Sequence, residues 1–192
     1  IFLGDYVDGW SESPQVLDFL MDLDKKQNCV FIRGNHDDLL LNYLKNNSYN
    51  VEWFKHGGKS TIEAYEKTDE STISKHINFL EKLVSNYLDE ENRLFGMPIP
   101  FTLWELALAL DKSIPFESEL YPSRLKLYKE IYIGHTPTTK INQTTPVHKA
   151  CIWNIDTGAA FTGPLTILDI ETKEFWQSDS LPSLYSNENG RN

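Results

Sequence analysis

The sequence has little of what marks several specialised classes of protein, above all cysteine and long apolar runs. Its two cysteines, Cys29 and Cys151, lie in no Cys-x-x-Cys pair, which excludes a disulfide framework and a thiolate zinc or redox site. No run approaches the roughly 20 apolar residues that a membrane span requires, and no signal-peptide pattern opens the chain. We therefore expect a cytoplasmic protein without a membrane partner.

Positive charge is scarce as well. The chain has 18 Lys and Arg against 28 Asp and Glu, which gives a formal net charge of −10. A field of this sign repels the phosphates of nucleic acid, so we expect no nucleic-acid partner. Bound divalent cations could still create a local positive site within an acidic cleft.

The length and composition predict one globular domain. The chain of 192 residues is 40% hydrophobic, 12% aromatic and 24% charged, which suffices for one substantial core. It begins Ile1-Phe2-Leu3-Gly4, an apolar run typical of a core strand, and natural domains seldom begin inside such a strand. We therefore expect a single domain over residues 1–192 that lacks residues upstream.

Hydrophobic periodicity predicts both strands and helices. Short apolar runs typical of strands cover residues 1–3, 29–32, 131–133 and 151–155, and a hairpin is expected from residues 165–170 and 174–176. Helices are expected to begin at Ser13-Pro14 and to cover 38–45, 71–87 and 103–110. His76 is expected to have a solvated or packing role, and the polar tail 178–192 to fray.

Three of the predicted strands end at a glycine that is followed by residues able to bind a metal. The three segments are Gly4-Asp5, Gly34-Asn35-His36 and Gly134-His135. Loops beyond the carboxyl ends of strands in an open α/β sheet converge on one crevice, so these segments can meet. Oxygen ligands from Asp and Asn together with a His nitrogen suit Mn, Fe or Zn better than a thiolate-preferring metal.

These segments resemble those of a known family, the calcineurin-like metallophosphoesterases. IFLGDYVDGW resembles the family's Gly-Asp-x-x-Asp motif, and FIRGNHDD its Gly-Asn-His-Glu motif, with Asp37 in the acidic place. YIGHTP and NIDTGAAFTGPLTIL resemble its late Gly-His and Asp-Thr-Gly-Ala segments. Within the family the chain looks most similar to bacterial Ser/Thr protein phosphatases. The resemblance implies an α/β fold, a four-layer α/β/β/α sandwich of mixed sheets, with the N-terminal strand or strands absent from this chain.

The resemblance also implies a role for each matching residue. Asp5, Asn35 and His135 would be ligands of two divalent metal ions (Mn, Fe or Zn), and His36 would be the general acid, oriented by Asp8. The implied reaction is hydrolysis of a phosphate monoester by in-line attack of a metal-bridging hydroxide. The histidine would protonate the leaving group.

The chain departs from the family pattern at two places that supply metal ligands. No Asp-x-His-Gly motif precedes the first matching segment, and no His segment follows an apolar strand in the middle of the chain. His56-Gly57-Gly58 has a polar context and follows His36 too closely, so Gly57 to Thr61 fits a Gly-Gly-x-x-Thr segment without a ligand better. We expect residues to be missing near 95–100, and little activity from these 192 residues alone.

A phosphate-binding arginine is also missing from its expected place. The family usually has Asp-Arg-Gly where this chain has Asp8-Gly9-Trp10, and the arginine grips phosphate. Arg93 and Arg124 are candidates to replace it, although both are more typical of surface charges. The substrate-binding residues are therefore unassigned.

Three functions remain open at this stage. The first is a phosphatase that acts on a phosphoprotein or a small phosphate ester, similar to the Ser/Thr protein phosphatases. The alternative is a dinucleoside polyphosphate hydrolase or phosphodiesterase on the same scaffold, since the metal core is shared. The second alternative is a non-catalytic binding module with a degraded site, which the missing ligands favour.

Overall fold

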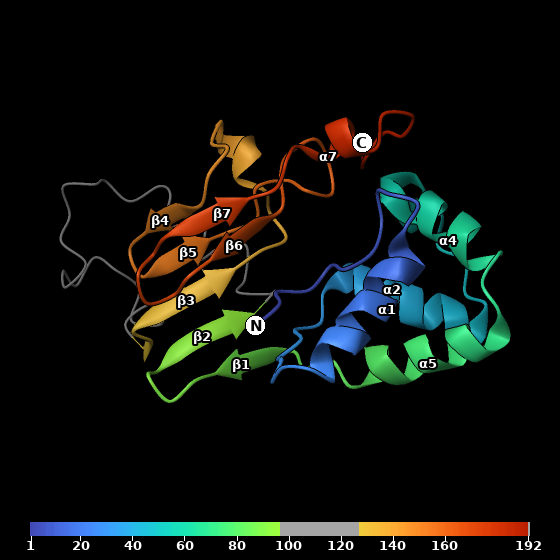
Figure 1. Ribbon diagram of the computed structural model, residues 1–192, viewed down its shortest axis with the longest axis horizontal. Coiled ribbons are helices and arrows are strands. Elements are labelled where there is room, and N and C mark those ends of the chain that lie inside the picture. Colours follow the sequence, from blue (N-terminus) through green and yellow to red (C-terminus); the bar gives the residue numbers. More distant parts are fainter. Residues whose placement is uncertain (97–126, 192) are drawn as a thin grey trace.

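The computed structural model describes residues 1–96 and 127–191 (Figure 1). The helical elements are α1 (Ser13–Asp24), α2 (Asn35–Asn46), α3 (Val51–Trp53), the π-helical turn η1 (Phe54–Gly58), α4 (Lys59–Tyr65), α5 (Glu70–Glu81), the 3-10 helix η3 (Thr138–Ile141) and α7 (Leu181–Leu184). The strands are β1 (Asn86–Leu88), β2 (Arg93–Gly96), β3 (Glu130–Ile133), β4 (Val147–Lys149), β5 (Ile152–Asn154), β6 (Thr166–Leu168) and β7 (Phe175–Gln177). The helix predicted at 103–110 lies outside the described residues.

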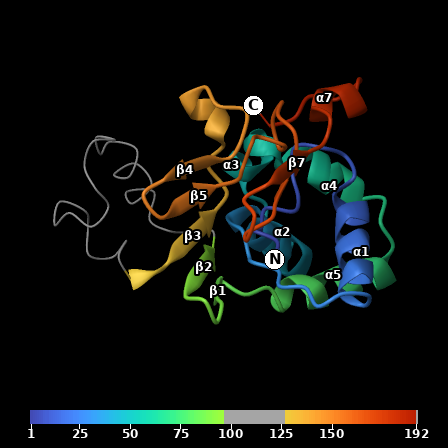
Figure 2. The ribbon, with the colours of Figure 1, turned by 60° about the vertical axis from the view of Figure 1, so that its left-hand side comes forward.

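The strands form a mixed five-stranded sheet and a two-stranded hairpin. The order in the larger sheet is β1-β2-β3-β5-β4, in which β2, β3 and β5 are parallel and the two outer strands are antiparallel. Strands β6 and β7 form the hairpin. Figures 1 and 2 show the strands gathered on one side of the molecule and α1, α2, α4 and α5 on the other. This is the predicted α/β fold with a mixed sheet, whereas the complete four-layer sandwich stays a prediction.

The two strands predicted at 1–3 and 29–32 are present only as isolated parallel bridges. Phe2 is bridged to Phe31, and Ile32 to Val84. The amide of Phe2 donates to Val30 over 2.8 Å, and the amide of Ile32 donates to Phe2 over 2.9 Å. The two segments therefore run side by side, and both lead directly into the loops that carry the candidate site.

Two clusters of apolar side chains can be defined among the described residues. The larger packs the helices against the N-terminal segments, and its buried members are Val7, Leu17, Leu20, Phe31, Leu40, Trp53, Ile62, Tyr65, Phe79, Leu80 and Leu83. The smaller lies at the sheet and contains Ile32, Phe95 and Tyr132, the last two with stacked rings 4.8 Å apart. Each fully buried side chain of this size contributes about 1.5–3 kcal/mol relative to an exposed one. The site loops are thus anchored on packed segments.

The helix predicted over 71–87 is shorter than its periodicity suggests. Helix α5 ends at Glu81, and the amide of Val84 donates to Phe31 over 3.1 Å. A non-local backbone pairing overrides the local helical pattern here. His76 in α5 is fully buried, and its ring is hydrogen-bonded to Tyr65 at 2.8 Å and to Asp18 at 3.1 Å, so its role is in packing.

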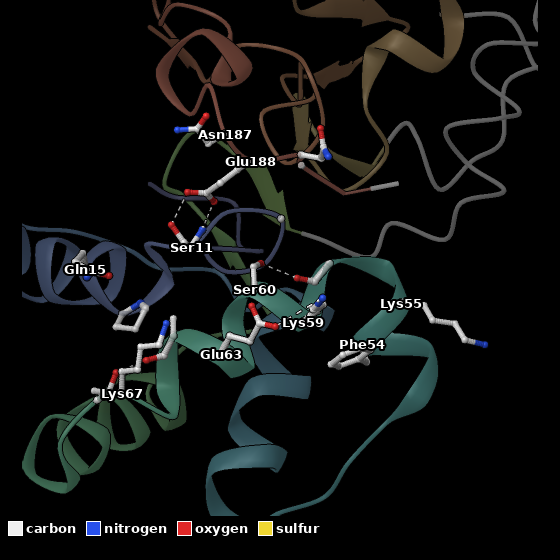
Figure 3. Close-up of a pocket in the computed structure, with 17 residues that line it drawn as sticks. Ser11, Gln15, Phe54, Lys55, Lys59, Ser60, Glu63, Lys67, Asn187 and Glu188 are labelled. Carbon is white, nitrogen blue, oxygen red and sulfur yellow. Dashed lines mark hydrogen bonds and ion pairs between the residues drawn. The ribbon is translucent and has the colours of Figure 1, made fainter.

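The C-terminal tail, which the sequence predicts to fray, is held against the loop after Asp8. The ring of Tyr185 stacks on Trp10 with centroids 5.1 Å apart. The carboxylate of Glu188 accepts hydrogen bonds from the amide and the hydroxyl of Ser11, at 2.9 and 2.7 Å (Figure 3). Aromatic stacking and these paired hydrogen bonds are long-range contacts that composition does not reveal. None of the helices in the described part of the chain is long and apolar enough to cross a membrane.

Candidate active site

The loops that follow the first two predicted strands touch at a pair of glycines. Gly4 has a φ of +86°, and a Cβ atom added to it would lie 2.6 Å from the amide nitrogen of Gly34. A Cβ atom on Gly34 would lie 2.1 Å from Oδ1 of Asp5. Any larger residue at either position would force the loops apart, so the glycines before the metal-competent residues are required by the close contact.

Asp37 ties the same two loops together. Its carboxylate accepts hydrogen bonds from the backbone amides of Gly34, Asp5 and Tyr6, at 2.7, 2.9 and 2.9 Å. Burial, together with the nearby charge of Asp5, raises the pKa of Asp37 to about 8. The acidic residue at this place therefore fixes the loops and does not face the cleft.

The carboxylate of Asp5 lies at the centre of the site. Its Oδ1 atom accepts the backbone N–H of His36 at 3.0 Å, and its Oδ2 atom lies 3.2 Å from Nδ1 of His135. Burial by itself would raise the pKa of Asp5, but the hydrogen bond to His135 and the charges of His36 and Arg191 outweigh it and hold the pKa below the usual range. The hydrogen bond with Asp5 in turn raises the pKa of His135.

Three of the candidate residues have left-handed backbone conformations. The φ angles of Asp5, Asp8 and His135 are 55°, 82° and 73°. Such conformations are uncommon for residues other than glycine, cost on the order of 1–3 kcal/mol each, and cluster at functional sites. The packed strands and helices on either side hold these residues in their strained conformations.

Asp8 and His36 form a buried pair. Oδ2 of Asp8 lies 2.5 Å from Nδ1 of His36 and 2.6 Å from the indole Nε1 of Trp53. Oδ1 of Asp8 accepts the hydroxyl of Thr61 at 2.6 Å. An ionised carboxylate can only accept hydrogen bonds, so the short contact is a hydrogen bond that Nδ1 of His36 donates. Nε2 of His36 is therefore the ring atom left to meet a substrate.

The structure brings most of the predicted site residues together. Asp5, His36 and His135 are joined by direct contacts, and Asp8 joins them through His36. Asn35 begins α2 next to His36, and its exposed side chain makes no hydrogen bond among the described residues. It therefore lies at the edge of the cluster.

The residues fit part of a metal centre. Asp5 and His135 supply one oxygen and one imidazole nitrogen in contact, which is a donor pair suited to Mn, Fe or Zn. Within residues 1–96 and 127–191, no group of three His, Cys, Asp or Glu side chains is placed so that it could hold a metal ion. The described residues thus place two candidate donors in contact, without a third His, Cys, Asp or Glu side chain in position beside them.

Asp156 is a nearby acid to which the sequence reasoning assigned no role. Burial, followed by the charge of Asp5, raises its pKa, and the charge of Arg191 acts in the opposite direction. Its carboxylate accepts the amide of Gly158 at 2.9 Å. Its place in the Asp-Thr-Gly-Ala segment is the feature of the sequence that could have indicated a role for Asp156.

Arg93 and His56, two further candidates from the sequence, have partners outside this cluster. Arg93 is paired with Asp89 at 2.6 Å and with Glu171 at 2.5 Å, and Arg124 lies outside the described residues. His56 is exposed and lies 3.8 Å from Glu52, consistent with its rejection as a ligand. The cation that does reach the site is Arg191, whose Nη1 atom lies 4.0 Å from Oδ2 of Asp5. Sequence alone gave no signal for it.

A pocket of about 810 Å³ lies next to Gly9 and Gly57 (Figure 3). The candidate site residues themselves do not line it. It shares Gly9, Gly57 and Gly190 with the surroundings of Arg191, and α4 and the C-terminal segment form its other walls. Three lysines and two glutamates are among the residues that line it: Lys55, Lys59, Lys67, Glu63 and Glu188. Its volume lies in the range of about 300–1,000 Å³ that small-molecule sites occupy.

Comparison with known proteins identifies the family. The model of a family described as calcineurin-like phosphoesterase matches residues 1–153. The bis(5'-nucleosyl)-tetraphosphatase PrpE [asymmetrical] of Anoxybacillus flavithermus (strain DSM 21510 / WK1) is 26% identical over 195 residues, covering 87% of this chain and 73% of that protein. A solved structure, "Crystal structure of a putative diadenosine tetraphosphatase", matches with a TM-score of 0.55 at 13% identity, over 91% of this chain and 77% of that one, which shows a shared fold. Because the family model matches most of the sequence, the chain belongs to the calcineurin-like phosphoesterase family.

Proposed function

We propose that the protein is a metal-dependent hydrolase of small phosphate compounds, with a dinucleoside polyphosphate as the preferred substrate class. The observation that carries the chemistry is the Asp8–His36 pair beside the contact of Asp5 with His135. The names of similar proteins favour this class over the phosphoprotein substrate that the sequence alone suggested first.

Divalent cations (Mn, Fe or Zn) are proposed cofactors. Asp5 and His135 would hold one of them, with Asn35 beside them as a further oxygen donor, and two are expected by resemblance to the family. Such cations, when bound, neutralise phosphate charge and make a water molecule a better nucleophile. What this chain itself contributes is their placement, because the packed glycine contact and Asp37 fix the position of Asp5.

His36 is the proposed proton donor. Asp8 holds its Nδ1–H, so the ring has a fixed orientation with Nε2 available to a leaving oxygen. A positioned acid of this kind contributes typically about 10²–10⁴-fold to a rate when the leaving group is a strong base. The alkoxide released from a phosphate ester is such a base, whereas a nucleotide released from a phosphoanhydride is a much weaker one.

This difference provides a test of both the residue and the substrate class. We expect His36→Ala, made in the complete gene product, to cause a large loss of turnover with an alkyl phosphate ester. The loss should be smaller with p-nitrophenyl phosphate or a dinucleoside polyphosphate, whose leaving groups are weaker bases. Divalent-cation affinity should change little in this variant, and His56→Ala, at an exposed histidine, is the matched control. Unchanged turnover of every substrate would remove His36 from the mechanism.

The pocket beside the site supports a small-molecule substrate. It borders Gly9, directly after Asp8, and its lysines could contact the phosphates of an extended polyphosphate chain. Cation-dependent hydrolysis of a bis(5'-nucleosyl) tetraphosphate at a higher kcat/KM than a phosphoserine peptide is the expected result. Faster cleavage of the peptide would reverse the choice in favour of a protein phosphatase.

A non-catalytic binding module remains the second candidate, because the described residues lack a three-ligand metal group. Titration of the complete gene product with Mn²⁺, followed by calorimetry, separates the two functions. The hydrolase requires stoichiometric binding that weakens in Asp5→Asn. No detectable binding of any divalent cation would support the module.

A further inference from the structure

The side chain of Arg191 is a buried cation with little of its hydrogen-bonding capacity used. It is 7% exposed, and its Nη2 atom donates to the carbonyl of Val7 at 2.8 Å. Its Nε atom is buried and has no hydrogen-bond partner. A guanidinium carries five N–H donors, and a buried donor without a partner is costly, so this group has donors to offer a ligand.

Two glycines form a slot that admits this side chain. A Cβ atom on Gly57, at a φ of +107°, would lie 2.7 Å from Cγ of Arg191, and one on Gly9 would lie 3.4 Å from the same atom. The amide of Gly9 donates to the carbonyl of Gly57 at 3.1 Å, which fixes the two sides of the slot relative to each other. The absence of side chains at these two positions therefore gives Arg191 its path to the site.

The C-terminal segment is anchored on both sides of the slot. The amide of Arg191 donates to the carbonyl of Ala160 at 2.7 Å, and Glu188 is bound to Ser11. The guanidinium ends beside Asp5, yet at 4.0 Å it is too far for a hydrogen bond. Its charge also acts to lower the pKa of His135 and of Asp156.

We propose that Arg191 is a substrate-binding residue that grips a phosphoryl group through its planar N–H fork. A fork of this kind matches two oxygens of a phosphate. Nη1 faces Asp5 without a hydrogen bond among the described residues, so it supplies the prong that a phosphate can reach. The alternative occupant of these donors would be a carboxylate, but Asp5 approaches only Nη1 and at ion-pair distance. This proposal rests on the proposed function, which supplies the class of ligand, a phosphorylated compound.

Binding of inorganic phosphate tests the proposal without requiring turnover. In the complete gene product with Mn²⁺ present, we expect Arg191→Gln to weaken phosphate binding, measured by calorimetry, about 10- to 100-fold, as expected for loss of charged hydrogen bonds. Arg191→Lys keeps the stem and the charge but loses the fork, so a smaller loss of several-fold is expected. Lys25→Gln removes one exposed charge directly after α1, paired with Asp22, and should leave binding unchanged.

The outcomes separate this proposal from the proposed function. The role of Arg191 would be overturned if Arg191→Gln bound phosphate as tightly as the natural protein, or if the natural protein bound none. Tighter binding by Arg191→Gln would also overturn it, and would show that the side chain obstructs the site. A phosphate affinity of Arg191→Lys equal to that of the natural protein would also overturn this role. The lysine variant therefore tests the proposal even if the glutamine variant does not fold. A protein that binds phosphate through Arg191 but cleaves no phosphate compound would refute only the proposed hydrolysis.

Discussion

Oδ2 of Asp8 lies 2.5 Å from Nδ1 of His36, and the Asp8 side chain is completely shielded from solvent. Trp53 and Thr61 donate to the same carboxylate, so its three hydrogen-bond donors are all side chains of the protein. A fully satisfied buried network of this kind holds a single arrangement. The histidine ring is thereby fixed in one tautomer before any substrate arrives.

The first prediction concerns that tautomer. Asp8→Asn keeps the shape but places an amide N–H₂ group among three donors, so the ring orientation of His36 should be lost. With an alkyl phosphate ester as substrate, we expect kcat to fall by about 10²–10⁴-fold while Mn²⁺ affinity changes little. Steady-state kinetics and calorimetry measure the two effects. Asp22→Asn, at an exposed carboxylate of α1, is the matched control, and equal losses in both variants would contradict the assignment.

The second prediction concerns the glycine contact between the loops. Gly4→Ala adds a methyl group 2.6 Å from the amide of Gly34 at a φ of +86°, so both a steric clash and backbone strain result. We expect the free energy of unfolding to fall by about 3 kcal/mol, as measured by urea denaturation. Gly96→Ala is the control, because Gly96 has no positive φ and its Cβ would lie 3.3 Å from Cβ of Asn86, a contact that a shift of a few tenths of an ångström relieves. Equal stability of the two variants would show that the loops are not held in this contact.

The third prediction is a pH dependence of stability that comes from Asp37. Burial raises the pKa of this carboxyl to about 8 from a usual value of 3.8, so the folded protein binds a proton that the unfolded chain releases. Its contribution to stability is therefore complete below about pH 4 and is lost as the pH rises through about 8. Urea denaturation between pH 5 and pH 9 should show this decline in the natural protein. In Asp37→Asn the decline should be smaller, and an identical profile would contradict the shift.

The fourth prediction concerns the ring of His135. The hydrogen bond with Asp5 raises the pKa of His135 above the usual 6.5, so NMR titration of the metal-free protein should give a value above that of an unperturbed histidine. In Asp5→Asn the pKa should fall, because the partner charge is gone. Since a proton on the ring competes with a cation, Mn²⁺ binding should tighten as the pH rises through this pKa. A pKa of His135 that is the same in both proteins would show that the contact is absent in solution.

Local sequence patterns were sufficient to predict the start of a helix and a hairpin, because capping residues and short apolar runs determine both. Ser13-Pro14 begins α1, and the expected hairpin is present as β6 and β7. The glycine-terminated strand ends led to Asp5, His36 and His135 because the loops after strands share one edge of the molecule. Their roles in catalysis and metal binding stay predictions.

Other features depend on partners far along the chain and could not be predicted locally. Helix α5 stops at Glu81 because Val84 pairs with Phe31 and Ile32. Asp8 finds Trp53 and Thr61 only after α3 and α4 have packed beside it. The junction near 95–100, where residues were expected to be missing, falls at the boundary of the described residues. Whether the domain is incomplete there and at its N-terminus stays a prediction.

The slot between Gly9 and Gly57 has a consequence for how this sequence can change through evolution. A side chain acquired at Gly57 would displace that of Arg191, and one at Gly9 would clash with the carbonyl of Ala160, which accepts the amide of Arg191. Loss of Arg191 would remove one reason for keeping both positions bare. Natural variants of this protein should therefore inherit the two glycines and the distant arginine as a set, and lineages that abandon one should abandon the others.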